Sequence, residues 1–319
     1  MKPMPQRFQR ATLLYNPHSG GSTRDRMEGL RRAAQALHER HIETELVATA
    51  AAGTAGEQAR AAVASGSDLI FACGGDGTVH DILQGMVGSA AALGVIPLGT
   101  ANALAWDLRL PRDPVAAALK QLSYTPRRIS AGIIEFMARE GAPARRYFTV
   151  MAGAGPDAEL VYDIAAWKTR AGILGYLLRA GLLYVTHHFS PFQAEFTDIA
   201  SGARITAVTP SVMAVRITDF GNILRRFAPG AALANDHLRI VVLGNSPRLA
   251  FLAHLSAALT GYRGSVPAVR IYSTREIVCT PIDHRPARRI GAEADGEHLG
   301  RIPARISIAP DAFTLLMPD

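Results

Sequence analysis

The sequence predicts an α/β domain built on a parallel sheet, followed by a second domain rich in β-strands. In the first part of the chain, short apolar runs alternate with amphipathic stretches at helical spacing, as in βαβ units. From about Arg127, strand-like segments follow one another with few helices between them. The 319 residues are enough for two domains. We place these domains at residues 1–126 and 127–303, and residues 304–319 are a candidate to return to the first.

The expected elements of the first domain alternate along the chain. Strands are expected at 12–15, 42–47, 69–73 and 93–96, and helices at 24–40, 55–64, 79–86 and from Asn102 toward Leu108. The helical spacing is clearest in the third helix, where Val79, Ile82 and Met86 recur on one face. The strands are short apolar runs of the kind that lie buried in a parallel sheet.

The second domain is expected to be a β-sandwich. Strand-like runs occupy 129–136, 146–152, 193–197, 205–208, 211–217, 238–243, 269–272, 276–280, 289–292, 305–308 and 313–317. Only two helical stretches intervene, at 157–187 and 247–260.

The composition, net charge and cysteine content of the chain indicate a folded protein with anionic ligands. Hydrophobic residues make up 48% of the chain and charged residues 19%, so a folded protein is expected. The net charge is +7 and comes almost wholly from arginine, which suits ATP or anionic lipid headgroups. No arginine run is interleaved with aromatic residues, so nucleic acid is not favoured. Cys73 and Cys279 are expected to be buried free thiols, which fits a reducing cytoplasm.

We expect no signal peptide and no transmembrane segment. No apolar stretch with a cleavage site follows the basic residues 1–10. The most apolar run, 171–185, is interrupted by Arg179 and falls short of the ~20 residues that a spanning helix needs.

A glycine-rich loop, 74–78, joins the third expected strand to the helix after it. Its glycines are expected to take positive φ and to let the backbone approach a bulky ligand. The amides at the start of the helix would then favour an anion, and Asp76 beside phosphates would require Mg²⁺ or a proton. A tight turn with an Asp or Thr N-cap is the alternative. Because the loops beginning at Asn16, Gly74 and Pro97 all follow strands, we expect them to meet at one edge of a Rossmann-like nucleotide-binding sheet.

Six motifs in order resemble those of the diacylglycerol kinase catalytic family, in the superfamily that also holds sphingosine kinases and NAD kinases. They are Asn16-Pro17-His18-Ser19-Gly20, Gly74-Gly75-Asp76-Gly77-Thr78, Pro97-Leu98-Gly99-Thr100-Ala101-Asn102, Gly153-Ala154-Gly155-Pro156-Asp157-Ala158, Leu233-Ala234-Asn235-Asp236-His237-Leu238 and Asp295-Gly296-Glu297. The resemblance spans about 13–317.

The resemblance implies three groups of functional residues. ATP would be bound by Asn16, Ser19, Thr49, Gly74, Gly75, Asp76, Gly77, Thr78, Val79, His80, Gly99, Thr100 and Asn102, of which Thr49 is matched only by its place after the second strand. Glu297 would be the catalytic base, with Asp295 and Asp76 also in the catalytic centre. A structural Mg²⁺ would be held by Asp236 and by the main-chain oxygens of Leu233 and Leu238.

The chain departs from the family pattern at two positions. Ala103 follows Asn102 where the family usually has Asp, so an acidic group is missing, and Asn-Ala-Leu-Ala is closer to sphingosine kinases. His237 stands where the family has Gly, which would be unfavourable if that position needs positive φ.

The function expected from these features is that of an ATP-dependent lipid kinase, cytoplasmic and peripheral at the inner membrane face. Its substrate would be diacylglycerol, phosphatidylglycerol or a sphingoid base. A NAD kinase is one alternative, although the loop at Pro97 argues against it. A nucleotide-binding regulator with a degraded site is the other. The oligomeric state is left open, with a homodimer as one option.

Overall fold

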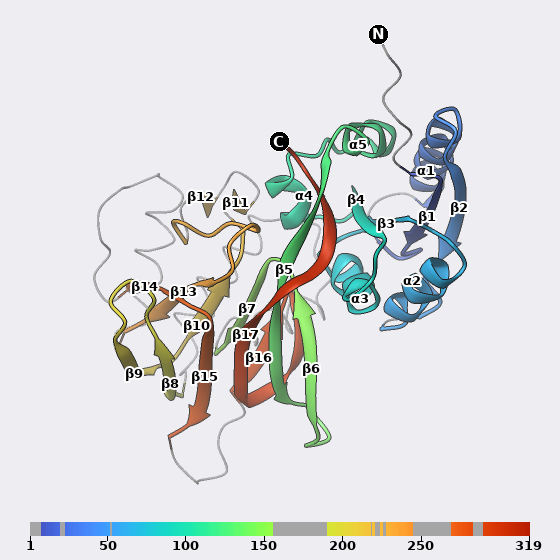
Figure 1. Cartoon of the computed structure of the whole chain (residues 1–319). Coiled ribbons are helices and arrows are strands. Elements are labelled where there is room, and N and C mark those ends of the chain that lie inside the picture. Colours follow the sequence, from blue (N-terminus) through green and yellow to red (C-terminus); the bar gives the residue numbers. More distant parts are fainter. Residues whose placement is uncertain are drawn as a thin grey trace. The chain divides into compact units, whose positions relative to one another are not determined.

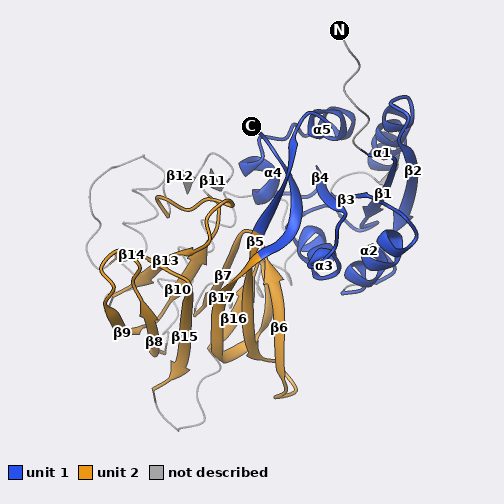
Figure 2. Cartoon of the chain, in the orientation of Figure 1, with its two compact units in different colours: residues 1–129, 311–319 blue, residues 130–310 orange. Residues whose placement is uncertain are grey.

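The structure is a computed structural model of the chain, and it describes residues 8–19, 23–51, 53–155, 190–217, 219–220, 224–225, 228–244, 269–282 and 290–319. Two compact units make up the chain (Figure 2). Unit 1 comprises residues 1–129 and 311–319, and unit 2 comprises residues 130–310. The helices expected at 157–187 and 247–260 lie outside the described residues, as do Gly20 and residues 156–158 of the motifs.

Unit 1 has the predicted α/β architecture (Figure 1). Its elements are β1 (Arg10–Tyr15), α1 (Thr23–His38), β2 (Glu43–Ala48), α2 (Ala55–Ala64), β3 (Leu69–Gly74), α3 (Asp76–Met86), β4 (Ala92–Pro97), α4 (Ala103–Asp107) and α5 (Pro114–Gln121). The strands pair in parallel in the order β4-β3-β1-β2. Both β3 and β4 are buried along their whole length, as expected for apolar runs in the middle of a parallel sheet.

The end of the chain adds a further parallel strand to this sheet. Thr314 and Leu315 pair with Ala92 and Leu93 of β4. Arg128 supports this arrangement, because its side chain donates hydrogen bonds to the carbonyl oxygens of Asp311 and Ser89.

The helix α5 is the element of unit 1 that the sequence analysis missed. It begins with an N-cap at Asp113, whose side chain accepts a hydrogen bond from the amide of Ala116, and Pro114 occupies the first turn. Its last residue, Gln121, is fully buried and bonds both the amide and the carbonyl of Val95 in β4. A helix start signal was therefore present at Asp113-Pro114.

Unit 2 is the predicted β-rich sandwich. Two of its strands continue into unit 1: β5 (Thr125–Met137) begins there and β17 (Glu297–Met317) ends there. The other strands are β6 (Pro143–Phe148), β7 (Met151–Ala154), β8 (Phe192–Thr197), β9 (Arg204–Thr209), β10 (Val212–Val215), β11 (Asp219–Phe220), β12 (Leu224–Arg225), β13 (Leu238–Leu243), β14 (Val269–Thr274), β15 (Glu276–Pro281) and β16 (Gly291–Ala294). Neighbouring strands in unit 2 pair antiparallel, for example β13 with β10 and β10 with β7. Their inward-facing side chains form one apolar core that includes Phe136, Phe148, Phe192 and Ile240.

Three strand predictions in the β-rich part of the chain were wrong in their bounds. The run 146–152 is not one strand, because β6 and β7 are separated at Thr149 and Val150. The strand expected at 289–292 is β16, Gly291–Ala294, two residues later. The runs 305–308 and 313–317 belong to one continuous strand, β17.

Candidate active site

The carboxyl ends of β1, β2, β3 and β4 bring together the first three candidate loops, all within unit 1. The amide of Asn16 donates to the carbonyl of Cys73, at 3.2 Å. The amide of Leu98 donates to the carbonyl of Gly74, at 2.9 Å, so the loops after β3 and β4 are also joined. Ligand sites of open α/β sheets lie at such an edge.

Thr49, the residue with the weakest sequence support, lies at the same edge. It follows β2 directly, and its amide donates to the carbonyl of Tyr15 at the end of β1, at 2.9 Å.

The glycine loop after β3 turns directly into α3. This helix begins at Asp76, three residues earlier than predicted, with Gly75 as its N-cap. The expectation of positive φ was wrong, because neither Gly74, Gly75 nor Gly77 is among the glycines with positive φ, and Gly75 has φ −93°. The loop consists of extended and helical backbone.

Close packing explains two of the glycines in these loops instead. A Cβ on Gly74 would lie 2.2 Å from the side-chain oxygen of Thr78. A Cβ on Gly99 would lie 2.5 Å from the Cα of Gly75, so the loops after β3 and β4 touch through their backbones. Gly75 itself has room for a side chain, since its Cβ would meet only the Cα of Gly99, at 3.4 Å.

Several side chains in this region hold the loops in place. Asp76 lies in the first turn of α3, and its Oδ1 accepts from the amide of Leu104 in α4, at 3.4 Å. The hydroxyl groups of Ser19 and Thr78 are 3.5 Å apart, which brings the first and second motifs together. Val79 and His80 are buried in α3, so their side chains belong to the core of unit 1.

Asn102 organises the third loop. Its side chain accepts a hydrogen bond from the amide of Gly99 and donates one to the Gly99 carbonyl, at 3.0 and 2.6 Å. Its backbone is left-handed, with φ 49°, a conformation that Asn tolerates better than most residues. Both polar groups of Asn102 are used inside the loop, whereas Thr100 is exposed. The main chain of this loop is therefore what a ligand would meet, together with Thr100.

In unit 2, Asp295 and Gly296 form the two-residue turn of the β16–β17 hairpin. Both have positive φ, 49° and 85°, as an Asp-Gly turn of type I′ requires. The Asp295 carboxylate is buried and accepts hydrogen bonds from the amides of Thr149, Val150 and Met151, at 2.9, 2.8 and 3.1 Å. This carboxylate therefore stabilises the break between β6 and β7.

Glu297 is placed differently from Asp295. It is the first residue of β17, opposite Ala294 of β16, and it is exposed. Asp295 was expected to lie in the catalytic centre with Glu297, but its carboxylate points into unit 2. Asp295 is a positioning residue for this hairpin, and Glu297 is the exposed carboxylate that the hairpin carries.

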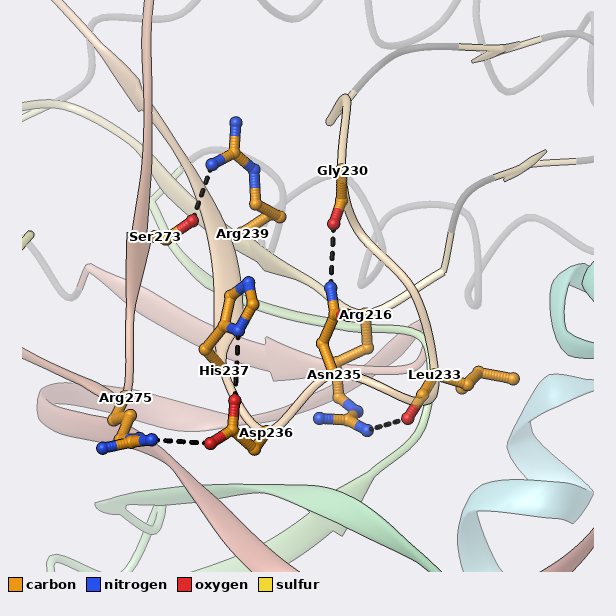
Figure 3. Close-up of polar contacts among 9 residues, drawn as sticks. All are labelled: Arg216, Gly230, Leu233, Asn235, Asp236, His237, Arg239, Ser273 and Arg275. Atoms are coloured by element: carbon orange, nitrogen blue, oxygen red, sulfur yellow. Dashed lines mark hydrogen bonds and ion pairs between the residues drawn. The ribbon is translucent and has the colours of Figure 1, made fainter. Parts of the chain in front are cut away.

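The residues expected to hold a structural Mg²⁺ do not fit that role (Figure 3). The Leu233 carbonyl accepts a hydrogen bond from the Arg216 guanidinium, at 2.9 Å. The Asp236 carboxylate is bound by Arg275, at 2.6 Å, and lies 3.3 Å from Nδ1 of His237. Leu238 is the first residue of β13 and pairs with Thr274. Among the described residues, no group of three or more acidic, His or Cys side chains is arranged to hold a metal ion.

The concern about His237 was also unfounded. His237 is not among the residues with positive φ, so this position does not require the left-handed backbone conformation that favours glycine. The side chain of His237 instead takes part in the polar contacts of Asp236.

Comparison with known proteins agrees with the fold and with its division into an α/β part and a β-rich part. Residues 10–134 match the family described as the diacylglycerol kinase catalytic domain. Residues 150–317 match the YegS C-terminal NAD kinase beta sandwich-like domain. A diacylglycerol kinase of Bacillus subtilis is 27% identical over 300 residues, which cover 93% of this chain and 92% of that protein.

Solved structures show the same fold. The structure of a diacylglycerol kinase from Bacillus anthracis superposes with a TM-score of 0.69 at 19% identity, covering 98% of this chain and 97% of the other. Yeast NADH kinase in complex with NADH superposes with a TM-score of 0.50 at 9% identity, covering 98% and 85%. An α/β unit followed by a β-sandwich of this type places the chain in the NAD kinase-like fold class. Within that class, the chain belongs to the diacylglycerol kinase family.

Proposed function

We propose that this protein is a lipid kinase that transfers the γ-phosphoryl group of ATP to the hydroxyl group of a membrane lipid. The observation that supports this most directly is the joining of three motif loops at the carboxyl edge of β1, β3 and β4. Phosphoryl transfer needs phosphates to be held, their charge to be neutralised and an acceptor to be placed in line. These loops present main-chain groups and the start of α3, which suit phosphates.

The roles within the chain follow from this geometry. The loops at Asn16, Gly74 and Pro97 bind and orient the triphosphate through their main chain. Mg²⁺ bound with ATP neutralises phosphate charge, and the Asp76 carboxylate at the start of α3 is the group in these loops suited to position it.

Glu297 is the base of the proposed reaction. The lipid oxygen forms a bond to the γ-phosphorus while the bond from that phosphorus to the bridging oxygen breaks, and ADP leaves. The proton of the lipid hydroxyl passes to the Glu297 carboxylate. An exposed carboxylate on a short hairpin is accessible to a substrate that remains in a bilayer.

The proposed substrate is an alcohol of the membrane, with diacylglycerol the first choice. Relatives that cover most of this chain are named diacylglycerol kinase, and they are 23–27% identical to it. Ala103 is the reason to keep phosphatidylglycerol and sphingoid bases in the substrate set. In the part of the chain that the structure describes, no helix is long and apolar enough to cross a membrane. We propose peripheral binding to anionic membranes because the chain carries a net charge of +7.

ATP consumption in the presence of lipid vesicles tests the proposal. Vesicles of phosphatidylcholine and phosphatidylglycerol are prepared with and without diacylglycerol, and with a sphingoid base in a third set. We expect ATP consumption that depends on the acceptor lipid, with the phosphorylated lipid identified by mass spectrometry. Consumption with NAD as the acceptor would instead indicate a NAD kinase. Binding of ATP with no turnover on any acceptor would indicate a nucleotide-binding regulator.

A vesicle sedimentation assay tests the peripheral binding separately. Binding to anionic vesicles should weaken as salt rises, because exposed charges are screened. Binding that is absent or independent of salt contradicts the peripheral assignment without affecting the kinase assignment.

A further inference from the structure

Arg216 is the largest side chain that the described part of the chain buries completely, with 1% of its surface exposed. It follows β10 directly, inside unit 2. Arginine is rarely buried to this extent unless it is paired, because removing its charge from water is costly. Its place in the interior of unit 2 therefore needs an explanation.

The guanidinium group joins two main-chain segments that are far apart in the sequence. Its Nη2 donates to the carbonyl oxygen of Ser130 in β5, at 2.8 Å, and to that of Leu233, at 2.9 Å. Burial lowers the pKa of Arg216 to about 10, and the negative charge of Asp295 acts in the opposite direction. The group is still a cation at neutral pH, and a carboxylate of the same unit supports its charge.

The loop from Ala228 to Leu238 is folded around this contact (Figure 3). The side chain of Asn235 donates to the carbonyl of Gly230, at 2.8 Å, which closes the loop on itself. The Asp236 carboxylate points to His237 and Arg275, whereas the Leu233 carbonyl points to Arg216. The carboxylate and the carbonyl that a metal would share therefore have different cationic partners.

We propose that the guanidinium of Arg216 is a built-in cation that takes the place of a divalent metal in this loop. It cross-links the carbonyls of Leu233 and Ser130, so residues 130–310 need no metal to hold the loop in place. A guanidinium suits this task because one nitrogen of its planar fork, Nη2, carries two hydrogens, one for each carbonyl, and the group does not dissociate as a metal ion does. A divalent ion at the Leu233 oxygen would also meet the repulsion of this charge. The inference does not depend on the proposed kinase activity.

The first test measures metal content and metal dependence of stability in the full-length protein without nucleotide. The protein is treated with EDTA, dialysed against millimolar MgCl₂ and then against metal-free buffer, and its bound metal is measured by mass spectrometry. We expect no stoichiometric Mg²⁺, Mn²⁺ or Ca²⁺. The Tm should be the same in EDTA and in millimolar MgCl₂ to within about 1 °C. One retained Mg²⁺ per chain would overturn the proposal, as would a rise in Tm of several degrees with MgCl₂ that Asp236→Asn abolishes.

The second test removes the cation. Arg216→Met leaves the partly buried carbonyl of Ser130 and the buried carbonyl of Leu233 without their donor, and Asp295 without a supporting charge, so Tm should fall by about 10 °C. Arg216→Lys keeps the charge but not the fork, and its Tm should lie between those of Arg216→Met and the wild type. Arg239→Met is the matched control, because Arg239 is a half-buried arginine of β13 whose Nη1 donates to the Ser273 hydroxyl and not to a carbonyl of this loop. Its Tm should fall much less.

The outcome remains decisive if Arg216→Met does not fold. Metal content of the wild type and the Tm of Arg216→Lys then decide the question. Arg216→Lys or Arg216→Met with the stability of the wild type would show that the guanidinium does not hold the loop.

Discussion

The loops at the carboxyl edge of unit 1 and the loop from Ala228 to Leu238 in unit 2 both carry family motifs, but the first are held by contacts among the motifs, whereas the second is bound by arginines from outside its motif. In unit 1 the contacts of Gly74, Gly99 and Asn102 lie within the motifs or between them. In unit 2 the motif depends on Asp236 and Leu233 being available as ligands. Both have partners from outside the motif, Arg275 and Arg216.

The difference has a physical reason. A turn between a buried strand and a helix is determined by local backbone conformation and by strands that are themselves predictable. A metal site depends on oxygen atoms that no other cation occupies, and one arginine elsewhere in the chain can change that. The following four predictions test this contrast, beginning with the largest expected effect.

The largest effect is expected at Glu297. Glu297→Gln keeps the shape of the side chain and removes the proton acceptor, so lipid phosphorylation should fall by ~10²–10⁴-fold. ATP affinity and Tm should stay near those of the wild type, because Glu297 is exposed at the start of β17. Turnover on diacylglycerol vesicles and a calorimetric titration measure the two quantities. Glu140→Gln, in the exposed turn between β5 and β6, is the control and should have no effect. Retention of most of the turnover by Glu297→Gln would remove Glu297 from the mechanism and redirect the search to Asp76.

The next effect separates two neighbouring glycines of unit 1. Gly75→Val places a branched side chain where phosphates are proposed to approach, and the fold has room for its Cβ. ATP affinity should fall by about 10²-fold, corresponding to the loss of two hydrogen bonds to a charged group, with Tm little changed. Gly99→Ala is the matched variant. Its Cβ would collide with the backbone of Gly75, so it should lower the free energy of unfolding by about 1–3 kcal/mol. Unchanged ATP affinity in a folded Gly75→Val protein, measured by titration calorimetry, would contradict the assignment of this loop.

A stability difference is expected between two carboxylates of unit 2. Asp295→Ala leaves the buried amides of Thr149, Val150 and Met151 without an acceptor, which should cost about 3 kcal/mol in the free energy of unfolding. Asp295→Asn should cost less, because it retains one oxygen acceptor and tolerates the left-handed backbone of the turn. Urea denaturation measures these changes. Asp236→Ala is the comparison, and it should have little effect because that carboxylate is exposed. Equal stabilities of the Asp295→Ala and Asp236→Ala variants would contradict the structural role of Asp295.

The smallest effect concerns the pH dependence of the Asp236–Arg275 pair. The hydrogen bond from Arg275 is the main cause that lowers the pKa of Asp236, and the one from His237 adds to it. A carboxyl whose pKa is lowered by folding contributes stability above its unfolded pKa of about 3.9, and this contribution is lost as the pH falls through the lower folded value. Arg275→Gln should therefore lower Tm by no more than about 2 °C at pH 7, and the difference should disappear near pH 2–3. Thermal unfolding scans across this range check it, and a difference that grows toward low pH would show that the pair is not its origin.

Much of the fold could be predicted because its elements depend on nearby residues. The apolar runs of β3 and β4 and the helix 55–64 were predicted within a residue or two, since burial in a parallel sheet and helical spacing leave clear patterns. Signals for two missed features were also present. Asp113-Pro114 is a helix start, and Asp295-Gly296 between two strand-like runs is typical of a type I′ hairpin. The roles of Glu297, Asp76 and the nucleotide loops stay predictions.

By itself, the sequence determined the family, the α/β-then-β architecture and the candidate loops, because these depend on local patterns and ordered motifs. Only the tertiary structure decided which polar groups are available to ligands. Asp295 bonds amides that lie 144–146 residues earlier in the chain, and Arg216 bonds the carbonyl of Ser130, 86 residues away. No spacing rule connects such pairs, because the packing of strands that are distant in sequence brings them together. For that reason the strand break at Thr149 and the cation at Leu233 could not be predicted from the motifs in which Asp295 and Leu233 lie.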